Sequence, residues 1–468
     1  MTSDELADVL STAATDLAVP GASAALSVGG VEQYAVHGVT SAENPLPVDR
    51  STLFQSGSIG KTFTSTALLR LVERGQLDLD APVRRYLPTL RLKDPAALEA
   101  ATVLHLLNHT AGWDGDFLIN TGEGDDALER YVERVIEIDQ VTPVGQTVSY
   151  NNTSLVLAGR ILEVLTGTTY EAALHDLVLA PLGLDETFFF ANDVMTRRFA
   201  VGHQRHPDGR VTVMRPWTSA RSGNPAGGMS TTSTDLLRWG RFHLGDGRAP
   251  DGRRLLSAVL LQRMQQPTAD MRGSALGDYV GISWLLRDAG GVRVVAHGGT
   301  TLGQHSELVL VPEKELIVTC LTNCSPNGAE LNRAVSRWAL RVFAGVNDAT
   351  PEPGQRSGEA LAGYAGVFET VAVTCTIDVE GERLLVRARS KPEMAKELGF
   401  EEDDEDDDEP IPLGLLGEDG DAYVVVDGPA KGMRGYFERD ADGAVRGVHI
   451  GGRLARRVAQ PATAGSAR

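Results

Sequence analysis

The chain has 468 residues, of which 42% are hydrophobic, and its formal net charge at pH 7 is −19. This length allows two or three domains, each with a sizeable core. A run of nine acidic residues at 401–409 supplies much of the charge and no basic patch stands out, so the composition argues against nucleic acid and anionic membranes as partners.

The N-terminal segment and the cysteines indicate the compartment. Met1 to Leu6 lacks the basic start and apolar core of a signal peptide, and no apolar run reaches the length of a membrane span. The three cysteines, Cys320, Cys324 and Cys375, form no disulfide framework, and the spacing of the first two is no convincing metal motif. We therefore expect a cytoplasmic protein without a metal or a cofactor.

The first predicted elements are a helix and two strands. Residues 5–18 have the spacing of an amphipathic helix, and strands are expected at 22–28 and 32–37, after Pro20-Gly21. A mainly helical region follows and continues to about residue 280.

The segment Ser58-Ile59-Gly60-Lys61 begins a helical run that Gly75 ends. Ser58 and Lys61 are three residues apart and share one face of a helical turn, where a lysine amine can activate a serine hydroxyl. The free amides at a helix start also suit an oxyanion. The alternative is that Ser58 only caps the helix, and the four-residue match alone is weak.

Tyr150-Asn151-Asn152 stands in a loop before a helical run from Leu155 to Leu165. Tyr150 is a candidate proton carrier, because a phenol near an ammonium group ionises more easily. Asn152 has an amide that can donate to a substrate carbonyl and accept from Lys61. In the alternative interpretation, Asn152 is only the cap of the helix.

His297-Gly298-Gly299 ends a predicted strand at 292–297, and further strands are expected near 281–287, 305–311 and 316–322. The glycines allow the backbone of a ligand to approach closely, and the Thr300 amide can form an oxyanion pair with the Ser58 amide. His297 can also be a structural histidine. His449-Ile450-Gly451 has the same H-x-G pattern, but we set it aside because it lies in a region expected to form a separate barrel.

The chain organisation predicts an α+β fold. The first strands, the last strands and a helix at 330–343 would form one antiparallel sheet flanked by helices, with an all-helical lobe between them. Ser58 lies where the two lobes should meet, which is a usual place for a substrate cleft. We place the boundary of this first domain at 1–345.

A second domain is predicted after a linker at 346–358. Short strands separated by turns predict a small β-barrel at 359–460, with the acidic run 401–409 as a solvated loop. The strands are expected at 364–368, 371–379, 383–388, 423–426, 435–439 and 445–450.

The motifs S-x-x-K, Y-x-N and H-x-G in this order resemble those of the serine β-lactamase and penicillin-binding-protein superfamily. The resemblance is closest to the class C β-lactamase-like branch of esterases and D-aminopeptidases, and it covers residues 5–345. Leu106 to Gly112 and Pro225 to Ser230 also resemble that branch and are interpreted as architectural. The predicted barrel looks like the lipocalin-like domain that follows some of these enzymes.

The resemblance implies a role for each residue. Ser58 would be acylated, Lys61 and Tyr150 would move its proton, and Asn152 would orient the substrate amide. The Ser58 and Thr300 amides would bind the oxyanion. His297, with Gly298 and Gly299, stands where β-lactamases usually carry the Lys of K-T-G, which replaces a fixed cation with an imidazole and disfavours penicillin-like carboxylates as substrates.

The leading hypothesis is a serine hydrolase that cleaves an ester or amide bond in a small molecule or peptide. The first alternative is an acyltransferase or peptide cyclase of the penicillin-binding-protein-type thioesterase kind, in which an amine captures the acyl-enzyme. The second is a β-lactam-binding sensor-like module that is acylated without turnover. Cleft loops within 110–130 and 200–230 would set the substrate, with candidates Trp113, Asp114, Asp116 and Arg221.

Overall fold

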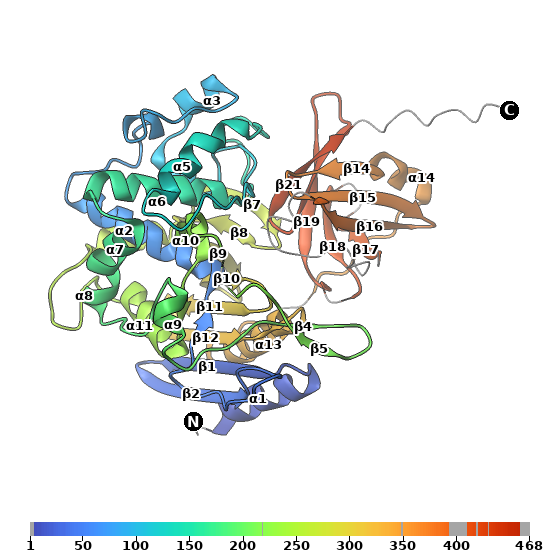
Figure 1. The fold of residues 1–468 in the computed structure, drawn as a ribbon. Coiled ribbons are helices and arrows are strands. Elements are labelled where there is room, and N and C mark those ends of the chain that lie inside the picture. The colour runs from blue at the N-terminus through green and yellow to red at the C-terminus, as the bar shows by residue number, and fades with distance from the viewer. Residues whose placement is uncertain are drawn as a thin grey trace.

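The computed structural model describes residues 4–217, 219–347, 350–392, 410–417, 420–428 and 430–458. An α+β part holds most of the chain, and a β-barrel lies beside it (Figure 1). The fold class is thus as the sequence predicts. None of the described helices is long and apolar enough to cross a membrane.

A central sheet of eight strands, in the order β2-β1-β12-β11-β10-β9-β8-β7, organises the first part. Every neighbouring pair is antiparallel. The strands are β1 (Gly21–Val28), β2 (Val31–Gly38), β7 (Ala269–Ser274), β8 (Gly277–Val280), β9 (Leu285–Ala289), β10 (Val292–Thr300), β11 (His305–Val311) and β12 (Leu316–Thr322). Chain segments separated by more than 230 residues therefore share one sheet.

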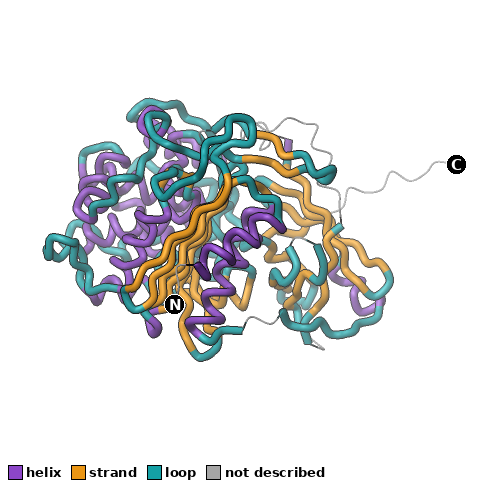
Figure 2. Tube along the Cα trace, turned by 90° about the horizontal axis from the view of Figure 1, so that it is seen from below, coloured by secondary structure: helices purple, strands orange, loops and turns teal. Residues whose placement is uncertain are grey.

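Helices cover both faces of this sheet, as Figure 2 shows for the strands and the helices beside them. On β11, Leu308 and Leu310 face one core and Val309 and Val311 face the other. The second core is closed by α1 (Asp4–Asp16) and α13 (Asn327–Ala339), and the first by α2 (Gly60–Glu73) and α11 (Ser233–Leu244). Burial on both faces explains why β12 and the second half of β11 are nearly continuous apolar runs, whereas β2 and β7 at the edges of the sheet carry charged and exposed residues.

The middle of the chain forms the helical lobe, with a three-stranded and a two-stranded sheet of short strands beside its helices. The helices are α3 (Pro95–Ala100), α4 (Val103–Leu107), α5 (Ala127–Arg134), α6 (Asn152–Thr166), α7 (Tyr170–Leu174), α8 (Ala180–Leu182), α9 (Ala191–Val194), α10 (Asn224–Gly227) and α12 (Ala258–Met264). The strands are β3 (Phe54–Gln55), β4 (His203–Arg205), β5 (Val211–Val213), β6 (Ser230–Thr231) and β13 (Cys324–Ser325).

Eight strands, β14 to β21, close the C-terminal barrel around its own apolar core. They are β14 (Gly366–Glu369), β15 (Val373–Glu380), β16 (Arg383–Ser390), β17 (Ile411–Leu415), β18 (Ala422–Val425), β19 (Arg434–Arg439), β20 (Val445–Ile450) and β21 (Arg453–Val458), after the short helix α14 (Gly358–Leu361). The sequence analysis missed β17, which contains a proline and a glycine, and β21, which contains three arginines. The predicted acidic loop at 401–409 lies outside the described residues, and the domain boundaries stay predictions.

Candidate active site

Ser58 and Lys61 meet at the start of α2. Ser58 lies in a 3-10 turn, Gly57–Ile59, directly before the helix, and it is half-buried. The Lys61 side chain is fully buried, and its Nζ donates to Ser58 Oγ at 2.9 Å and to the Ala226 carbonyl at 2.6 Å. Ser58 does not cap α2, because the capping position is Ile59 and has no side-chain bond. The capping alternative is therefore wrong.

The surroundings of Lys61 favour its neutral amine. Burial is the largest cause that holds the pKa of Lys61 well below the usual range of a lysine, and the positive charge of Arg453 lowers it further. The carboxylate of Asp116 acts in the opposite direction but does not outweigh them. A neutral amine 2.9 Å from a hydroxyl can accept its proton.

Tyr150 lies at the centre of a group of basic side chains. Lys61 Nζ and the Arg453 guanidinium carbon each lie 4.9 Å from its ring centroid. The imidazole of His109 lies 4.5 Å away and that of His297 6.1 Å away, centroid to centroid. Burial raises the pKa of Tyr150 above its ordinary value, whereas a hydrogen bond with Ser58 and the charge of Arg453 lower it. The phenol is therefore protonated near neutral pH and is placed to pass a proton on.

Asn151, not Asn152, caps α6. The Asn151 side chain accepts from the Ser154 amide at 2.7 Å, and the helix begins at Asn152. The interpretation of Asn152 as the cap is therefore wrong. The Asn152 Nδ2 donates to Asp116 Oδ1 at 2.7 Å.

His297 is buried and neutral. Its Nδ1 lies 2.6 Å from the Gly298 carbonyl, which can only accept, so Nδ1 carries the proton and Nε2 is an acceptor. Nε2 is buried and has no partner among the described residues. Burial, followed by the charge of Lys61, lowers the pKa of His297 to about 3. The position therefore supplies no cation at neutral pH.

The Ser58 and Thr300 amides line one junction, where β10 passes the 3-10 turn. Thr301 donates to the Gln304 carbonyl at 3.0 Å, so alternation along the hairpin directs the Thr300 amide away from β11. On the other side of β10, the pairing with β9 ends at Ala296, four residues before Thr300, so the Thr300 amide lies beyond this pairing as well. A Cβ on Gly57, whose φ is +50°, would lie 2.7 Å from the Thr300 nitrogen. Two amides without sheet partners at one junction are suited to an oxyanion.

The barrel also contributes to this site, through the turn between β20 and β21. The Gly452 carbonyl accepts from the Tyr150 amide at 2.8 Å, and His449 Nε2 lies 3.0 Å from the Val148 carbonyl. Arg453 forms an ion pair with Asp116, with Nε 2.5 Å from Oδ2. The segment we set aside at 449–451 is thus correctly placed in a barrel, but the barrel is not separate from the site.

Sequence reasoning missed two of these residues and gave little weight to a third. Arg453 carries no motif, and His109 stood within a stretch interpreted as architectural. Asp116 was one of four unsupported loop candidates. Of the other three, Trp113 is buried in the core, Asp114 accepts from the Val371 amide of the barrel at 2.7 Å, and Arg221 pairs with Glu171. The positive φ of His109, +60°, is unusual for a residue other than glycine, but only a structure reveals it.

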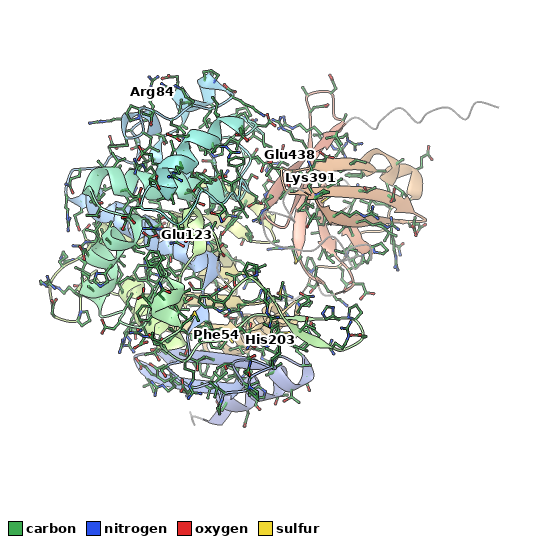
Figure 3. The ribbon with its side chains drawn as sticks, in the orientation of Figure 1. Phe54, Arg84, Glu123, His203, Lys391 and Glu438 are labelled. Carbon is green, nitrogen blue, oxygen red and sulfur yellow. The ribbon has the colours of Figure 1, made fainter. Side chains whose placement is uncertain are left out.

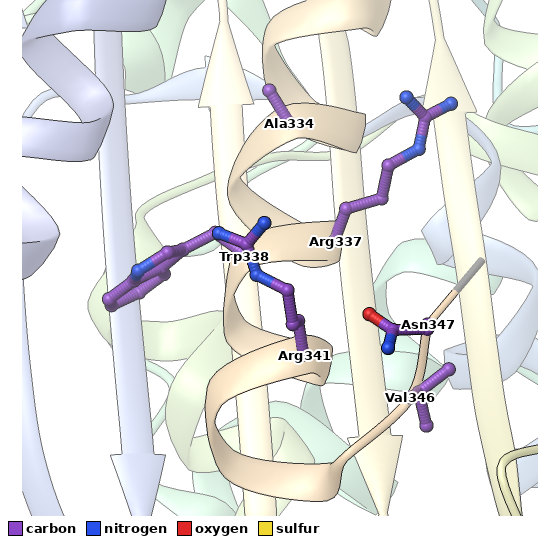
Figure 4. A pocket seen from close by; sticks show the side chains of 6 residues that line it. All are labelled: Ala334, Arg337, Trp338, Arg341, Val346 and Asn347. Carbon is purple, nitrogen blue, oxygen red and sulfur yellow. The ribbon is translucent and has the colours of Figure 1, made fainter. Parts of the chain in front are cut away.

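Two cavities differ in their relation to this site. One has a volume of about 250 Å³, lies on α13 and is lined by Arg337, Trp338 and Arg341 (Figure 4). This cavity and Ser58 lie on opposite faces of the central sheet, because α13 covers one face and α2 the other. The other, of about 410 Å³, is lined by Gly227 and Thr301, close to Ser58. Among the described residues, no group of three or more His, Cys, Asp or Glu side chains is placed to hold a metal.

Comparisons with known proteins cover both parts of the chain. A family model described as Beta-lactamase matches residues 6–342. Penicillin-binding protein 4 of Amycolatopsis lactamdurans is 36% identical over 312 residues, which are 66% of this chain and 82% of that protein. The crystal structure of SurE aligns with a TM-score of 0.74 and 23% identity over 97% of this chain and 99% of its own. A class C β-lactamase from Rhodobacter sphaeroides aligns with a TM-score of 0.60 and 24% identity over 72% of this chain and 99% of its own.

Proposed function

The chain belongs to the β-lactamase family, whose members are serine hydrolases, and we propose that it cleaves an ester or amide bond through an acyl-enzyme on Ser58. The observation that carries this proposal is the 2.9 Å contact between Ser58 Oγ and a fully buried Lys61. A lysine whose pKa is lowered by burial loses its proton more readily and can be the base that a serine nucleophile requires.

Acylation follows from the positions of these groups. Lys61 accepts the Ser58 proton while Oγ attacks the substrate carbonyl, and the oxyanion forms beside the Ser58 and Thr300 amides. Tyr150 passes a proton to the leaving group and recovers it from Lys61. One C–O bond forms on Ser58, the bond to the leaving group breaks, and the leaving group departs with the proton.

Deacylation repeats this sequence with water as the nucleophile and Ser58 as the leaving group. Lys61 and Tyr150 move the proton, and His297 Nε2 is a further buried acceptor beside Tyr150. Because His297 is uncharged, this position does not supply the cation that a lysine there would offer to a substrate carboxylate. This supports esters, amides or peptides without that carboxylate as substrates.

The proposal is tested by intact-protein mass spectrometry during turnover of activated esters, D-aminoacyl amides and a β-lactam. We expect a mass adduct and steady product release with the wild type, and neither with Ser58→Ala. Ser65→Ala is the matched control, because it removes another hydroxyl of the same helix, one that contacts Ser283. Turnover retained by Ser58→Ala would contradict the proposal.

The same experiment distinguishes the alternatives to hydrolysis. An amine added as a second substrate yields an amide product if the protein is an acyltransferase, and only the free acid if it is a hydrolase. A stoichiometric adduct on Ser58 without further product release would instead indicate a sensor-like module.

A further inference from the structure

The cavity of about 410 Å³ lies beside Ser58, although Ser58 itself is not one of the residues that line it. Gly227 forms part of its wall, and a Cβ there would lie 3.1 Å from the Ser58 nitrogen. Thr301, directly after Thr300 of the expected oxyanion site, forms another part. Lys61, Tyr150 and Asn152 do not line it. A leaving group must face its proton donor, so a cavity that Lys61 and Tyr150 do not line is the candidate for the acyl side of the bond to be cleaved.

Aromatic side chains form the outer walls of this cavity. They are Phe189 and Phe190 from the segment before α9, and Trp217 from the loop before α10. Trp217 is held in place, since its indole N–H donates to the Ala200 carbonyl at 3.0 Å and its ring packs edge-on against Phe199 at 5.6 Å. Gln55 also donates to the Trp217 carbonyl. A fixed aromatic wall can bind an apolar group with little loss of side-chain entropy.

The charged side chains around the cavity also favour some substrate groups over others. Arg221 lies 5.1 Å from the Phe190 ring, but its guanidinium is already paired with Glu171 at 3.1 Å and with Asp125 at 2.9 Å. Glu123, labelled in Figure 3, is exposed at the rim, and its carboxylate has no partner among the described residues. The uncompensated charge near the opening is therefore negative, which disfavours an anionic substrate group.

We propose that this cavity binds the side chain of the acyl group and selects a large apolar side chain, neutral or positively charged, over one that carries a carboxylate. The proposal rests on the proposed acyl-enzyme at Ser58. A volume of 410 Å³ exceeds the roughly 150 Å³ that suffices for a benzene ring, so an arylalkyl group fits.

The test is a set of p-nitrophenyl esters that differ only in the acyl group: acetate, butanoate, 3-phenylpropanoate, glutarate and 4-aminobutanoate. We expect kcat/KM for 3-phenylpropanoate to exceed that for acetate by about tenfold or more, the range that apolar pockets give. Glutarate should be slower than butanoate, and 4-aminobutanoate should not be. Equal rates for all neutral esters, or a preference for glutarate, would overturn the inference.

Variants of the lining residues then test which side chains cause this selectivity. Trp217→Ala and Phe190→Ala should each lower the ratio of kcat/KM for 3-phenylpropanoate to that for acetate by about tenfold. Trp338→Ala, at the cavity on α13, is the matched control and should not change this ratio. Glu123→Gln should reduce the discrimination against glutarate. An unchanged ratio in Trp217→Ala and Phe190→Ala would overturn the inference, whereas ester turnover by Ser58→Ala would contradict the proposed function itself.

Discussion

The candidate residues are coupled through charge, and that coupling makes the ionisation of Lys61 open to test. Arg453, which is partly exposed, and the buried Asp116 form an ion pair beside Tyr150 and act on Lys61 with opposite signs. The sequence provides the nucleophile and its base within four residues, because a helical turn fixes their spacing. It cannot provide Arg453, because that contact depends on how two distant segments pack.

Replacing either partner should shift the pH dependence of kcat/KM in a known direction. Arg453→Ala removes a positive charge that lowers the pKa of Lys61 and leaves Asp116, which raises it, so the pKa rises. The limb that requires neutral Lys61 then moves to higher pH, and activity at pH 7 falls. Asp116→Asn removes the charge that raises the pKa of Lys61, so this limb should move to lower pH. The measurement is kcat/KM from pH 5 to 10.

Folding must be checked, since each substitution leaves a charge without its partner, and in Arg453→Ala that charge is the buried Asp116 carboxylate. Arg387→Ala serves as the control, because it removes a barrel arginine whose partner, Asp378, lies on the neighbouring strand. A shift of the same sign in Arg453→Ala and Asp116→Asn would contradict this account of the Lys61 pKa.

At the scale of single elements, the close contact between β10 and the 3-10 turn forms the expected oxyanion site. The sequence analysis attributed the glycines of β10 to the approach of a ligand backbone. The structure instead places the protein's own turn against one of them. A Cβ on Gly299 would lie 1.9 Å from the Ser56 carbonyl oxygen and 2.8 Å from the Ser58 nitrogen, whereas one on Gly298 would meet only the Ser306 carbonyl oxygen, at 3.4 Å.

Gly299→Ala should therefore separate β10 from Ser58 and lower kcat by about 10² to 10³, the usual cost of losing one oxyanion donor. Gly298→Ala changes the neighbouring residue of the same strand and should retain most of the activity, because its Cβ has room. Steady-state kinetics and far-ultraviolet circular dichroism on both variants provide the test. Equal losses of kcat in the two variants would show that the contact between β10 and the 3-10 turn does not determine the activity.

Element boundaries could be predicted where one local signal dominates. The apolar runs of β11 and β12 identify both as strands, and Gly167, whose φ is +71°, ends α6 two residues after the predicted helical run. The cap of α6 was misassigned because adjacent asparagines offer the same side chain, and only the register of the first turn selects Asn151. In β21, three arginines obscure the strand pattern in the sequence.

At the scale of the whole molecule, the barrel is joined to the α+β part by polar contacts with the segment directly before Tyr150. His449 contacts the Val148 carbonyl, and the Thr147 hydroxyl donates to Glu438 at 3.0 Å. Figure 3 labels Glu438 on the side of the barrel that faces the helical lobe. Such a buried polar interface can be predicted from neither part alone, because the residues of each part look like surface positions until the other covers them.

This interface should make the stability of the molecule sensitive to acid. Burial lowers the pKa of His449 to about 4, below the ordinary histidine value of 6.5. Between these two pH values the unfolded chain binds a proton there that the folded chain does not, so stability falls as the pH falls, by about 1.4 kcal/mol per pH unit for each such histidine. His449→Gln should remove the one proton that the unfolded chain takes up at this position, and so flatten the dependence of unfolding free energy on pH between about 6.5 and 4.

All five tryptophans lie before the barrel, at 113, 217, 239, 284 and 338, so urea unfolding followed by their fluorescence reports the α+β part. If the barrel contacts stabilise that part, this fluorescence will detect the effect of His449→Gln, whereas His175→Gln, at an exposed histidine, will leave the curve as it is. A tryptophan transition with the same pH dependence in His449→Gln and the wild type would mean that the two parts unfold independently.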